Sequence, residues 1–253
     1  MDARFSEFSY GYSLTQELVN EYSYLLAAAP TFPSLIEEGR VGGYDVNIAL
    51  TGFPLFLQFK LSEYMLRSNA LESGVLGVPY FRFKLRPSKY SDQHALLVDL
   101  ESRGNFVYYV APIFYEVSEL NTAFFSRNVT TQSIFISPLE IGTLPDDESH
   151  CVVFSSSSSD AYFCSDPKMI KMPIHGRRLA ESFKTRMSNL QPYNMDRQFF
   201  DRLADEMMLI IKAEQPIFDM ELISTQRREL NPVLFVSYLS RTFFDCEFLI
   251  LRA

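Results

Sequence analysis

Gly43-Tyr44-Asp45-Val46-Asn47-Ile48 and Pro54-Leu55-Phe56-Leu57-Gln58-Phe59-Lys60 are the two segments that decide the fold of this chain. They read as two short apolar strands joined by a turn at residues 51–54. Side chains alternate between the two faces of a strand, so Gln58 and Lys60 point to the same face. If the strands pair, one carboxylate, one amide and one ammonium meet at one end of a small sheet. A buried charge is costly unless it is paired or bound to a metal, so a lysine inside an apolar run needs a partner.

The residue types of this hairpin suit the hydrolysis of a phosphodiester bond. That reaction needs a divalent cation, which activates water and neutralises the developing charge. Mg²⁺ takes oxygen ligands and keeps several waters, so one or two carboxylates are enough to hold it. We expect Asp45 and a helix carboxylate to hold the metal, Gln58 to add an amide oxygen, and Lys60 to act on the water.

A helix that precedes the hairpin supplies a candidate for the second carboxylate. Ser13 and Gln16 have the form of a capping box, and apolar residues then recur at helical spacing until the helix stops before Pro30. Several glutamates compete for the role of metal ligand: Glu17, Glu21, Glu37 and Glu38.

The order helix-Glu, Gly-x-Asp and then Gln-x-Lys on a strand resembles the PD-(D/E)xK nuclease superfamily. It is most similar to the branch with Gln in place of the acidic third residue, as in Mrr-type restriction endonucleases and nuclease domains of bacterial antiphage effectors. The matching residues are Glu17, Asp45, Gln58 and Lys60, whereas Tyr44 stands where the family has proline. The resemblance implies metal-dependent cleavage of DNA, with Mg²⁺ or Mn²⁺ as cofactor, and it favours Glu17 as the helix ligand.

The remaining patterns predict an α/β protein with two parts. We expect a restriction-endonuclease-like core over residues 1–167, with a mixed sheet flanked by helices, and a helical C-terminal extension over residues 168–253 packed on it. The expected helices lie at 62–71, 91–103, 116–126, 176–189, 194–212 and 232–243. The expected strands lie at 80–85, 106–110 and 133–136, with a hairpin at 151–154 and 161–164. The final apolar run at 248–251 fits a helix end or an edge strand.

Composition excludes several classes of protein. The net charge of −8 gives no sign of the basic face that usually marks nucleic-acid binding proteins. The three cysteines show no CxxC spacing, which indicates reduced thiols in the cytoplasm. We expect no membrane span, because no run of about 18 apolar residues occurs. The chain also lacks a Walker-type glycine loop, a Rossmann fingerprint and the G-x-S-x-G motif of serine hydrolases.

A local basic site is still compatible with an acidic chain. Arg82, Lys84 and Arg86 alternate with apolar residues, so they share one strand face and are candidates for contacts with phosphates. The alternative is a solvated strand face.

Three hypotheses follow from the sequence. The first is a Mg²⁺-dependent DNA endonuclease that acts in bacterial defence, as a homo-oligomer or with a partner subunit. The second is a nuclease fold that has lost catalysis and serves in binding or assembly. The third is a cytosolic interaction protein of unrelated α/β fold. For Asp45, Gln58 and Lys60 themselves, the alternative to a catalytic site is a hairpin whose polar face meets water, with Lys60 protecting a sheet edge.

Overall fold

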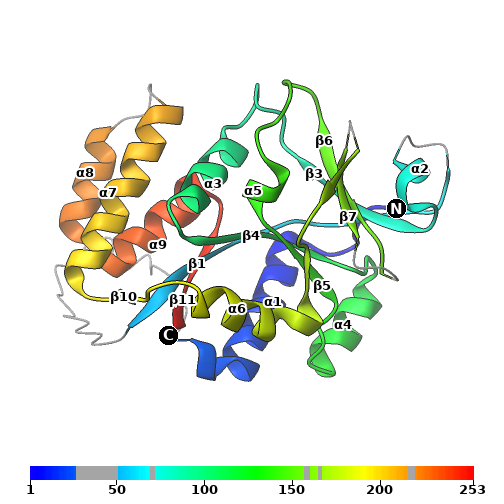
Figure 1. Cartoon of the computed structure of the whole chain (residues 1–253), viewed down its shortest axis with the longest axis horizontal. Helices are drawn as coiled ribbons and strands as arrows, with labels where there is room; N and C mark the ends of the chain where they lie inside the picture. The colour runs from blue at the N-terminus through cyan, green and yellow to red at the C-terminus, as the bar shows by residue number, and fades with distance from the viewer. Residues whose placement is uncertain (27–50, 69–71, 157–159, 165–166, 216–219) are drawn as a thin grey trace.

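The computed structural model describes residues 1–26, 51–68, 72–156, 160–164, 167–215 and 220–253 (Figure 1). The predicted strand at 43–48 lies outside the described residues. Asp45, Glu37 and Glu38 therefore lie outside them too.

Two sheets organise the described residues. The main sheet has the order β10-β1-β4-β5-β9, and β11 also pairs with β1. Its strands are β1 (Thr51–Phe59), β4 (Phe106–Pro112), β5 (Ser133–Ile136), β9 (Ile174–His175), β10 (Tyr193–Asn194) and β11 (Glu247–Arg252). The β1–β4 pair is parallel and the other pairs are antiparallel, so the main sheet is mixed.

The second sheet is antiparallel throughout and has the order β2-β3-β6-β7-β8. Its strands are β2 (Glu63–Met65), β3 (Tyr80–Leu85), β6 (His150–Phe154), β7 (Ala161–Cys164) and β8 (Lys168–Ile170). Parallel strands need a long connection. The chain between β1 and β4 provides it by forming β2 and β3 of the second sheet and then helix α3 (Gln93–Ser102).

β1 is a buried strand because its apolar run is continuous. Phe53, Leu55 and Leu57 enter one core cluster, whereas Phe56 faces the other. Residues 51–54 were predicted to be a turn, and that prediction is wrong, because they pair with β10 and β11 as the first part of β1. β11 pairs along one side of β1 from Gly52 to Leu57, and β4 pairs along the other side from Leu55 to Phe59.

The main sheet is covered on both faces (Figure 1). One face, called here the α1 face, packs against α1 (Glu7–Glu21), α4 (Val117–Phe125) and α6 (Leu179–Ser188). The other, called here the α3 face, packs against the second sheet, α3, α5 (Pro138–Ile141), α7 (Arg197–Glu214) and α9 (Pro232–Phe243). α8 (Met220–Glu229) adjoins α9, and α2 (Ser73–Leu76) follows β2.

Helix α1 begins about two turns earlier than the sequence predicted, with Ser6 rather than Ser13 as its cap. The hydroxyl of Ser6 accepts a hydrogen bond from the backbone N–H of Ser9 at 3.0 Å and caps the helix. Ser13, the predicted cap, lies inside the helix and donates its hydroxyl to the carbonyl of Ser9. The earlier start places Glu7 in the first turn of α1.

Most other predicted elements are confirmed within a few residues. The strands β3, β4 and β5, the β6–β7 hairpin and the helices α3, α4, α6, α7 and α9 lie where the patterns predicted them. Asn231 caps α9 with Pro232 in its first turn, also as predicted. The helix predicted at 62–71 is wrong, because residues 63–65 pair with β3.

The C-terminal helices share the core of the main sheet. Residues of α7 and α9 belong to the same apolar cluster as Phe56 and Tyr109. The run at 248–251 is a strand, since it forms most of β11 and pairs along β1. The predicted fold class, a mixed sheet flanked by helices with further helices toward the C-terminus, is confirmed. Within the described residues, no helix is long and apolar enough to cross a membrane.

Candidate functional site

A polar cluster lies at the end of β1 on the α3 face of the main sheet. Gln58 is fully buried and Lys60 is 7% exposed, although both follow an apolar run. Their side chains point to the same face, as the alternation along the strand predicted. We call the group formed by Gln58, Lys60, Gln93, Asp245 and Glu7 the Lys60 cluster.

A chain of hydrogen bonds links four members of the Lys60 cluster. The Lys60 ammonium donates to Gln93 Oε1 at 3.1 Å, and Gln93 Nε2 donates to Asp245 Oδ2 at 3.0 Å. Gln58 Nε2 donates to the same carboxylate oxygen at 3.4 Å. The Asp245 carboxylate thus accepts hydrogen bonds from the amides of Gln58 and Gln93, and Gln93 in turn accepts one from Lys60.

Asp245 reaches this position from the turn between α9 and β11. Its backbone φ is +54°, in the left-handed region that aspartate tolerates better than most residues. The turn is fixed on either side, because both Phe244 and Cys246 are buried. The backbone N–H of Cys246 also donates to the carbonyl of Ser240.

Among the described residues, no donor reaches the amide oxygen of Gln58. Gln58 Oε1 is buried and has no hydrogen-bond partner among the described residues. Leaving a buried acceptor unsatisfied costs about 1–3 kcal/mol, and such an atom calls for an explanation such as a bound water or ion. The orphaned oxygen belongs to the side chain that also contacts Asp245.

Burial lowers the pKa of Lys60 to about 8. The carboxylates of Glu7 and Asp245 act in the opposite direction and favour the charged form, whereas the Arg86 guanidinium adds to the lowering. The ammonium also lies 5.5 Å from the centre of the Tyr109 ring. Lysines with such a lowered pKa recur at functional sites, because they exchange protons near neutral pH.

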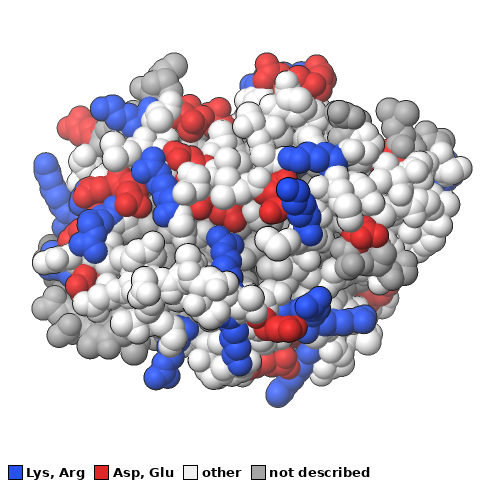
Figure 2. Space-filling view, in the orientation of Figure 1, with Lys and Arg blue, Asp and Glu red and all other residues white. Residues whose placement is uncertain are grey.

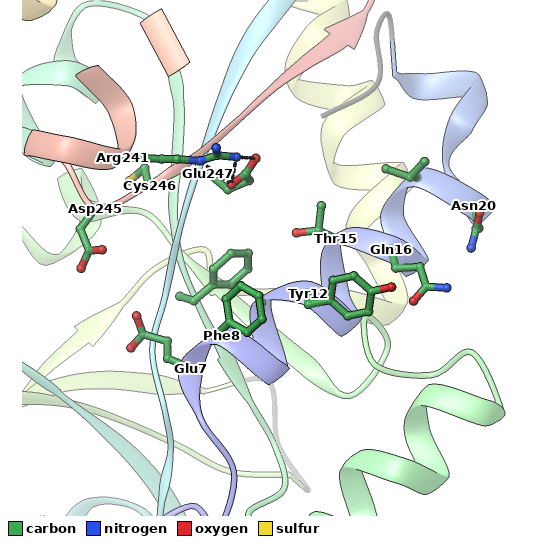
Figure 3. A pocket seen from close by; sticks show the side chains of 13 residues that line it. Glu7, Phe8, Tyr12, Thr15, Gln16, Asn20, Arg241, Asp245, Cys246 and Glu247 are labelled. Carbon is green, nitrogen blue, oxygen red and sulfur yellow. Dashed lines mark hydrogen bonds and ion pairs between the residues drawn. The ribbon is translucent and has the colours of Figure 1, made fainter. Parts of the chain in front are cut away.

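Glu7 is the carboxylate of α1 that approaches Lys60. Burial raises the pKa of Glu7, the Lys60 ammonium lowers it, and the Asp245 carboxylate raises it again. Figure 3 shows the carboxylates of Glu7 and Asp245 pointing toward one another across the mouth of a pocket. Two like charges that face each other repel unless a cation joins them.

Glu17, the predicted helix ligand, lies elsewhere. Its two carboxylate oxygens accept hydrogen bonds from the backbone N–H groups of Val129, at 2.7 Å, and Thr130, at 2.9 Å. These partners follow α4 on the α1 face, whereas Lys60 contacts α3 on the opposite face. The structure therefore brings Gln58 and Lys60 together and does not bring Glu17 to them.

The three predicted phosphate contacts have different surroundings. Arg82 pairs with Glu63 at 2.8 Å and with Glu72 at 3.0 Å, and Lys84 pairs with Glu63 at 2.7 Å. The carboxylates of Glu63, on β2, and Glu72, directly before α2, thus already pair with these two cations. Arg86 is exposed, pairs with no carboxylate among the described residues, and influences both Glu7 and Lys60.

The pocket beside the Lys60 cluster has a volume of about 570 Å³. It lies between α1 and the residues that join α9 to β11, next to the point where β11 begins opposite Leu57. Figure 3 shows Phe8 and Tyr12 of α1 along one side of it. Its lining includes Glu7 and Asp245 of the Lys60 cluster, whereas Gln58, Lys60 and Gln93 do not line it.

Charges of both signs are mixed over the face of the molecule in Figure 2, with no continuous basic surface among the described residues drawn there. Within the described ranges, no three His, Cys, Asp or Glu side chains gather in a way that holds a metal ion. Any metal at the Lys60 cluster would therefore need the amide oxygen or residues beyond those ranges.

No match exists to a protein family, a curated protein or a solved structure.

Sequence reasoning missed Glu7, Gln93 and Asp245. Asp245 is 187 residues from Gln58 in the chain, and no spacing rule joins them. The sequence carries a signal for Glu7, since Ser6 before Glu7 is a typical start of a helix, but Ser13 and Gln16 match the fuller capping-box pattern.

Proposed function

We propose that this protein is a Mg²⁺- or Mn²⁺-dependent nuclease that hydrolyses phosphodiester bonds, with DNA as the expected substrate. The observation that carries the proposal is a hydrogen-bonded network that links a buried lysine with a pKa of about 8, through Gln93, to the Asp245 carboxylate. The same carboxylate accepts from the Gln58 amide, whose oxygen has no partner among the described residues. The resemblance of the Gln-x-Lys segment to PD-(D/E)xK nucleases leads to the same reaction.

The residues of the Lys60 cluster fit a hard divalent cation. Mg²⁺ and Mn²⁺ prefer oxygen donors, and the cluster offers the Asp245 carboxylate, the orphaned Gln58 oxygen and the facing Glu7 carboxylate. Asp45 is the further ligand expected from the sequence. When bound, the metal supplies an activated water and neutralises charge on the phosphate.

Lys60 is suited to handle a proton beside such a centre. With a pKa of about 8, a fraction of its side chain is the neutral amine near neutral pH, and that form accepts a proton from water. The charged form instead stabilises negative charge on a phosphate. Gln93 fixes the position of the amine, because its amide is itself held by Asp245.

Arg86 provides a contact for the nucleic-acid backbone. It is exposed, close enough to influence Lys60 and Glu7, and unpaired among the described residues. An arginine in this position binds a phosphate oxygen without reading the base. We therefore assign phosphate binding to Arg86 rather than to Arg82 or Lys84, whose carboxylate partners already engage them.

Cleavage of supercoiled plasmid and of single-stranded DNA in the presence of Mn²⁺ tests the proposal. We expect Lys60→Met, Asp245→Asn and Asp45→Ala each to lose at least about two orders of magnitude in rate, as for removal of a general base or a charge-stabilising group. Lys184→Met, an exposed lysine on α6, is the matched control and should retain full activity. Cleavage by both Lys60→Met and Asp245→Asn at the wild-type rate would overturn the assignment.

A second function is a catalytically inactive nuclease-fold subunit that acts in binding or assembly. The position of Glu17 favours it, because backbone N–H groups occupy both oxygens of the carboxylate that the resemblance assigns to the metal. Titration with Mn²⁺ separates the two functions. Saturable Mn²⁺ binding that Asp245→Asn removes supports the enzyme, whereas the absence of saturable Mn²⁺ binding by the wild type supports the inactive subunit.

We also propose that the protein acts in the cytoplasm, as a homo-oligomer or with a partner subunit, in antiviral defence. An acidic chain gains little from general attraction to nucleic acid, so another subunit would help to bring the substrate to the Lys60 cluster.

A further inference from the structure

Cys151 and Cys164 face each other across the β6–β7 hairpin. They are direct partners in its antiparallel register, so their side chains leave the same face of the second sheet. Residues paired in this way have Cα atoms about 4.5–5.5 Å apart, within the range of about 4.4–6.8 Å that a disulfide bond requires. Both cysteines are free thiols, so the strands already hold them in place for oxidation to a disulfide.

The two thiols lie on the face of the second sheet that points away from the main sheet. They form a small apolar cluster with Tyr80 and Val153, whereas the alternate residues of β6 and β7 belong to the core shared with the main sheet. Helix α2 contributes Leu76 to the cover of this cluster, and none of the four residues of α2 is buried. A cover with so little buried surface opens locally at small cost, which admits an oxidant as small as hydrogen peroxide.

Glu72, directly before α2, makes the two thiols unequal. The Cys151 S–H donates to Glu72 Oε1 at 3.3 Å, and Arg82 holds the same oxygen at 3.0 Å. A hydrogen bond with Cys164, burial and the Glu72 carboxylate all raise the pKa of the Cys151 thiol. The hydrogen bond from Cys151 lowers the pKa of the Cys164 thiol, against burial and the Glu72 charge. Cys164 therefore ionises first, and the thiolate is the form of cysteine that reacts as a nucleophile.

We propose that Cys151 and Cys164 are a peroxide-reactive dithiol that closes reversibly into a disulfide bond. The Cys164 thiolate attacks one oxygen of hydrogen peroxide and becomes a sulfenic acid, and the departing hydroxide takes up the proton that the thiol had released. The Cys151 sulfur then attacks the Cys164 sulfur and displaces the sulfenic hydroxyl group, which leaves as water with the Cys151 proton. Two thiols are oxidised to one disulfide, and one peroxide is reduced to two waters.

This site is separate from the Lys60 cluster and goes beyond the proposed nuclease. Disulfides of cytoplasmic proteins are usually transient and redox-sensing, so the reduced pair is the resting state of such a site. Oxidation removes the S–H that Glu72 accepts and joins β6 to β7 covalently. A reducing dithiol reverses both changes.

Cys246 is an internal control in the same chain. It is buried in the core shared by the main sheet and the C-terminal helices, and burial raises the pKa of its thiol well above the ordinary value. A thiol in such surroundings is inert. We expect hydrogen peroxide to leave Cys246 reduced in the folded protein.

Mass spectrometry of the full chain after exposure to hydrogen peroxide tests the proposal. Chymotrypsin cleaves after aromatic residues, and Phe154, Tyr162 and Phe163 lie between the two cysteines, so a disulfide alone holds the resulting fragments together. We expect linked fragments from the oxidised wild type and their release by dithiothreitol. Cys246 should remain free for alkylation once the protein is unfolded.

Single variants assign the role of each sulfur. Cys151→Ser should stop at the sulfenic acid of Cys164, which dimedone labels, and should give no linked fragments. Cys164→Ser should consume peroxide at least about tenfold more slowly than the wild type, because it lacks the thiol that ionises first. Cys246→Ser is the matched control and should form the disulfide at the wild-type rate. Circular dichroism shows which variants are folded.

Three results would each overturn the proposal. The first is the absence of linked fragments from the folded wild type after treatment with peroxide. The second is a disulfide that joins either cysteine to Cys246 or to another copy of the chain. The third is oxidation of Cys246 in the folded protein as fast as oxidation of the pair, because the reaction would then not depend on the β6–β7 register.

Discussion

Glu17 and Lys60 lie on opposite faces of the main sheet. Glu17 accepts backbone hydrogen bonds from the residues after α4 on the α1 face, and Lys60 donates to Gln93 of α3 on the α3 face. The carboxylate of α1 that does reach the lysine is Glu7, in the first turn of that helix.

Replacement of Glu17 by glutamine should destabilise the protein without changing the chemistry of the folded form. Each carboxylate oxygen of Glu17 accepts one backbone N–H, whereas glutamine has one acceptor oxygen, so one N–H loses its partner. We expect a loss of about 1–3 kcal/mol in the free energy of unfolding, measured in urea. Cleavage or metal binding per folded molecule should equal the wild type.

Glu21→Gln, one turn further along α1, is the matched control and should change stability by less than about 0.5 kcal/mol. A folded Glu17→Gln protein that loses Mn²⁺ binding would restore Glu17 to the metal site and show that the two faces communicate.

The buried lysine should give the stability of the protein a pH dependence of known sign. The pKa of Lys60 is about 8 in the folded chain and about 10.5 in the unfolded chain, so between these values the unfolded chain holds more protons. Stability therefore rises with pH across that window, by about 3 kcal/mol in total. Below about pH 8 both forms are charged and this contribution is flat.

Urea unfolding of the wild type and of Lys60→Met at several pH values checks this prediction. Other groups titrate in both proteins, so the difference between them isolates Lys60. We expect the wild type to gain about 3 kcal/mol relative to Lys60→Met from about pH 8 to about pH 10.5. A constant difference would mean that the lysine is solvated and has an ordinary pKa.

The sequence predicted the fold class because the apolar patterns are strong. β4 is apolar at nearly every position and buried on both faces, and α9 begins at the Asn231-Pro232 signal. Residues 62–71 were misread because three residues of strand, paired only with β3, are too few to show alternation. The turn at 51–54 was misread because glycine and proline favour turns, whereas pairing with β11 draws these residues into β1.

The candidate site was predictable only where it is local in the chain. Gln58 and Lys60 are two residues apart on a strand, and their common face follows from geometry alone. Gln93 and Asp245 meet them through the packing of α3 and of the α9–β11 turn, 33 and 187 residues away, and no pattern in one sequence encodes that meeting.

Asp245 should tolerate asparagine better than alanine. Its φ of +54° is accessible to asparagine at small cost, whereas alanine pays about 1–2 kcal/mol for the left-handed region. Asp245→Asn removes the negative charge that favours the Lys60 ammonium, so the pKa of Lys60 should fall further. We expect Asp245→Ala to unfold at a lower urea concentration than Asp245→Asn, and both to lose saturable Mn²⁺ binding.

The comparison of the two variants separates strain from charge. Equal stability of Asp245→Asn and Asp245→Ala would mean that the turn relaxes out of the left-handed region. Mn²⁺ binding by Asp245→Asn at the wild-type affinity would remove Asp245 from the ligand set.

Mutation of Arg82 should lower the stability of the protein, whereas mutation of Arg86 should weaken the binding of DNA. Arg82 joins Glu63 and Glu72 beside the second sheet, so Arg82→Ala should cost about 1–3 kcal/mol in the free energy of unfolding. Arg86 has no carboxylate partner among the described residues, so Arg86→Ala should leave stability within about 0.5 kcal/mol of the wild type.

Fluorescence anisotropy at several salt concentrations, in EDTA, measures the binding of single-stranded DNA. Here Arg86→Ala should have the larger effect and Arg82→Ala the smaller. If Arg86 binds one phosphate, Arg86→Ala weakens binding to all sequences alike and reduces the slope of log K against log salt by about 0.7. Arg202→Ala, an exposed arginine on α7, is the matched control and should keep the slope. An unchanged slope in Arg86→Ala would mean that Arg86 does not bind a phosphate. A lower slope in a folded Arg82→Ala protein would mean that the phosphate lies against the second sheet and not beside Lys60.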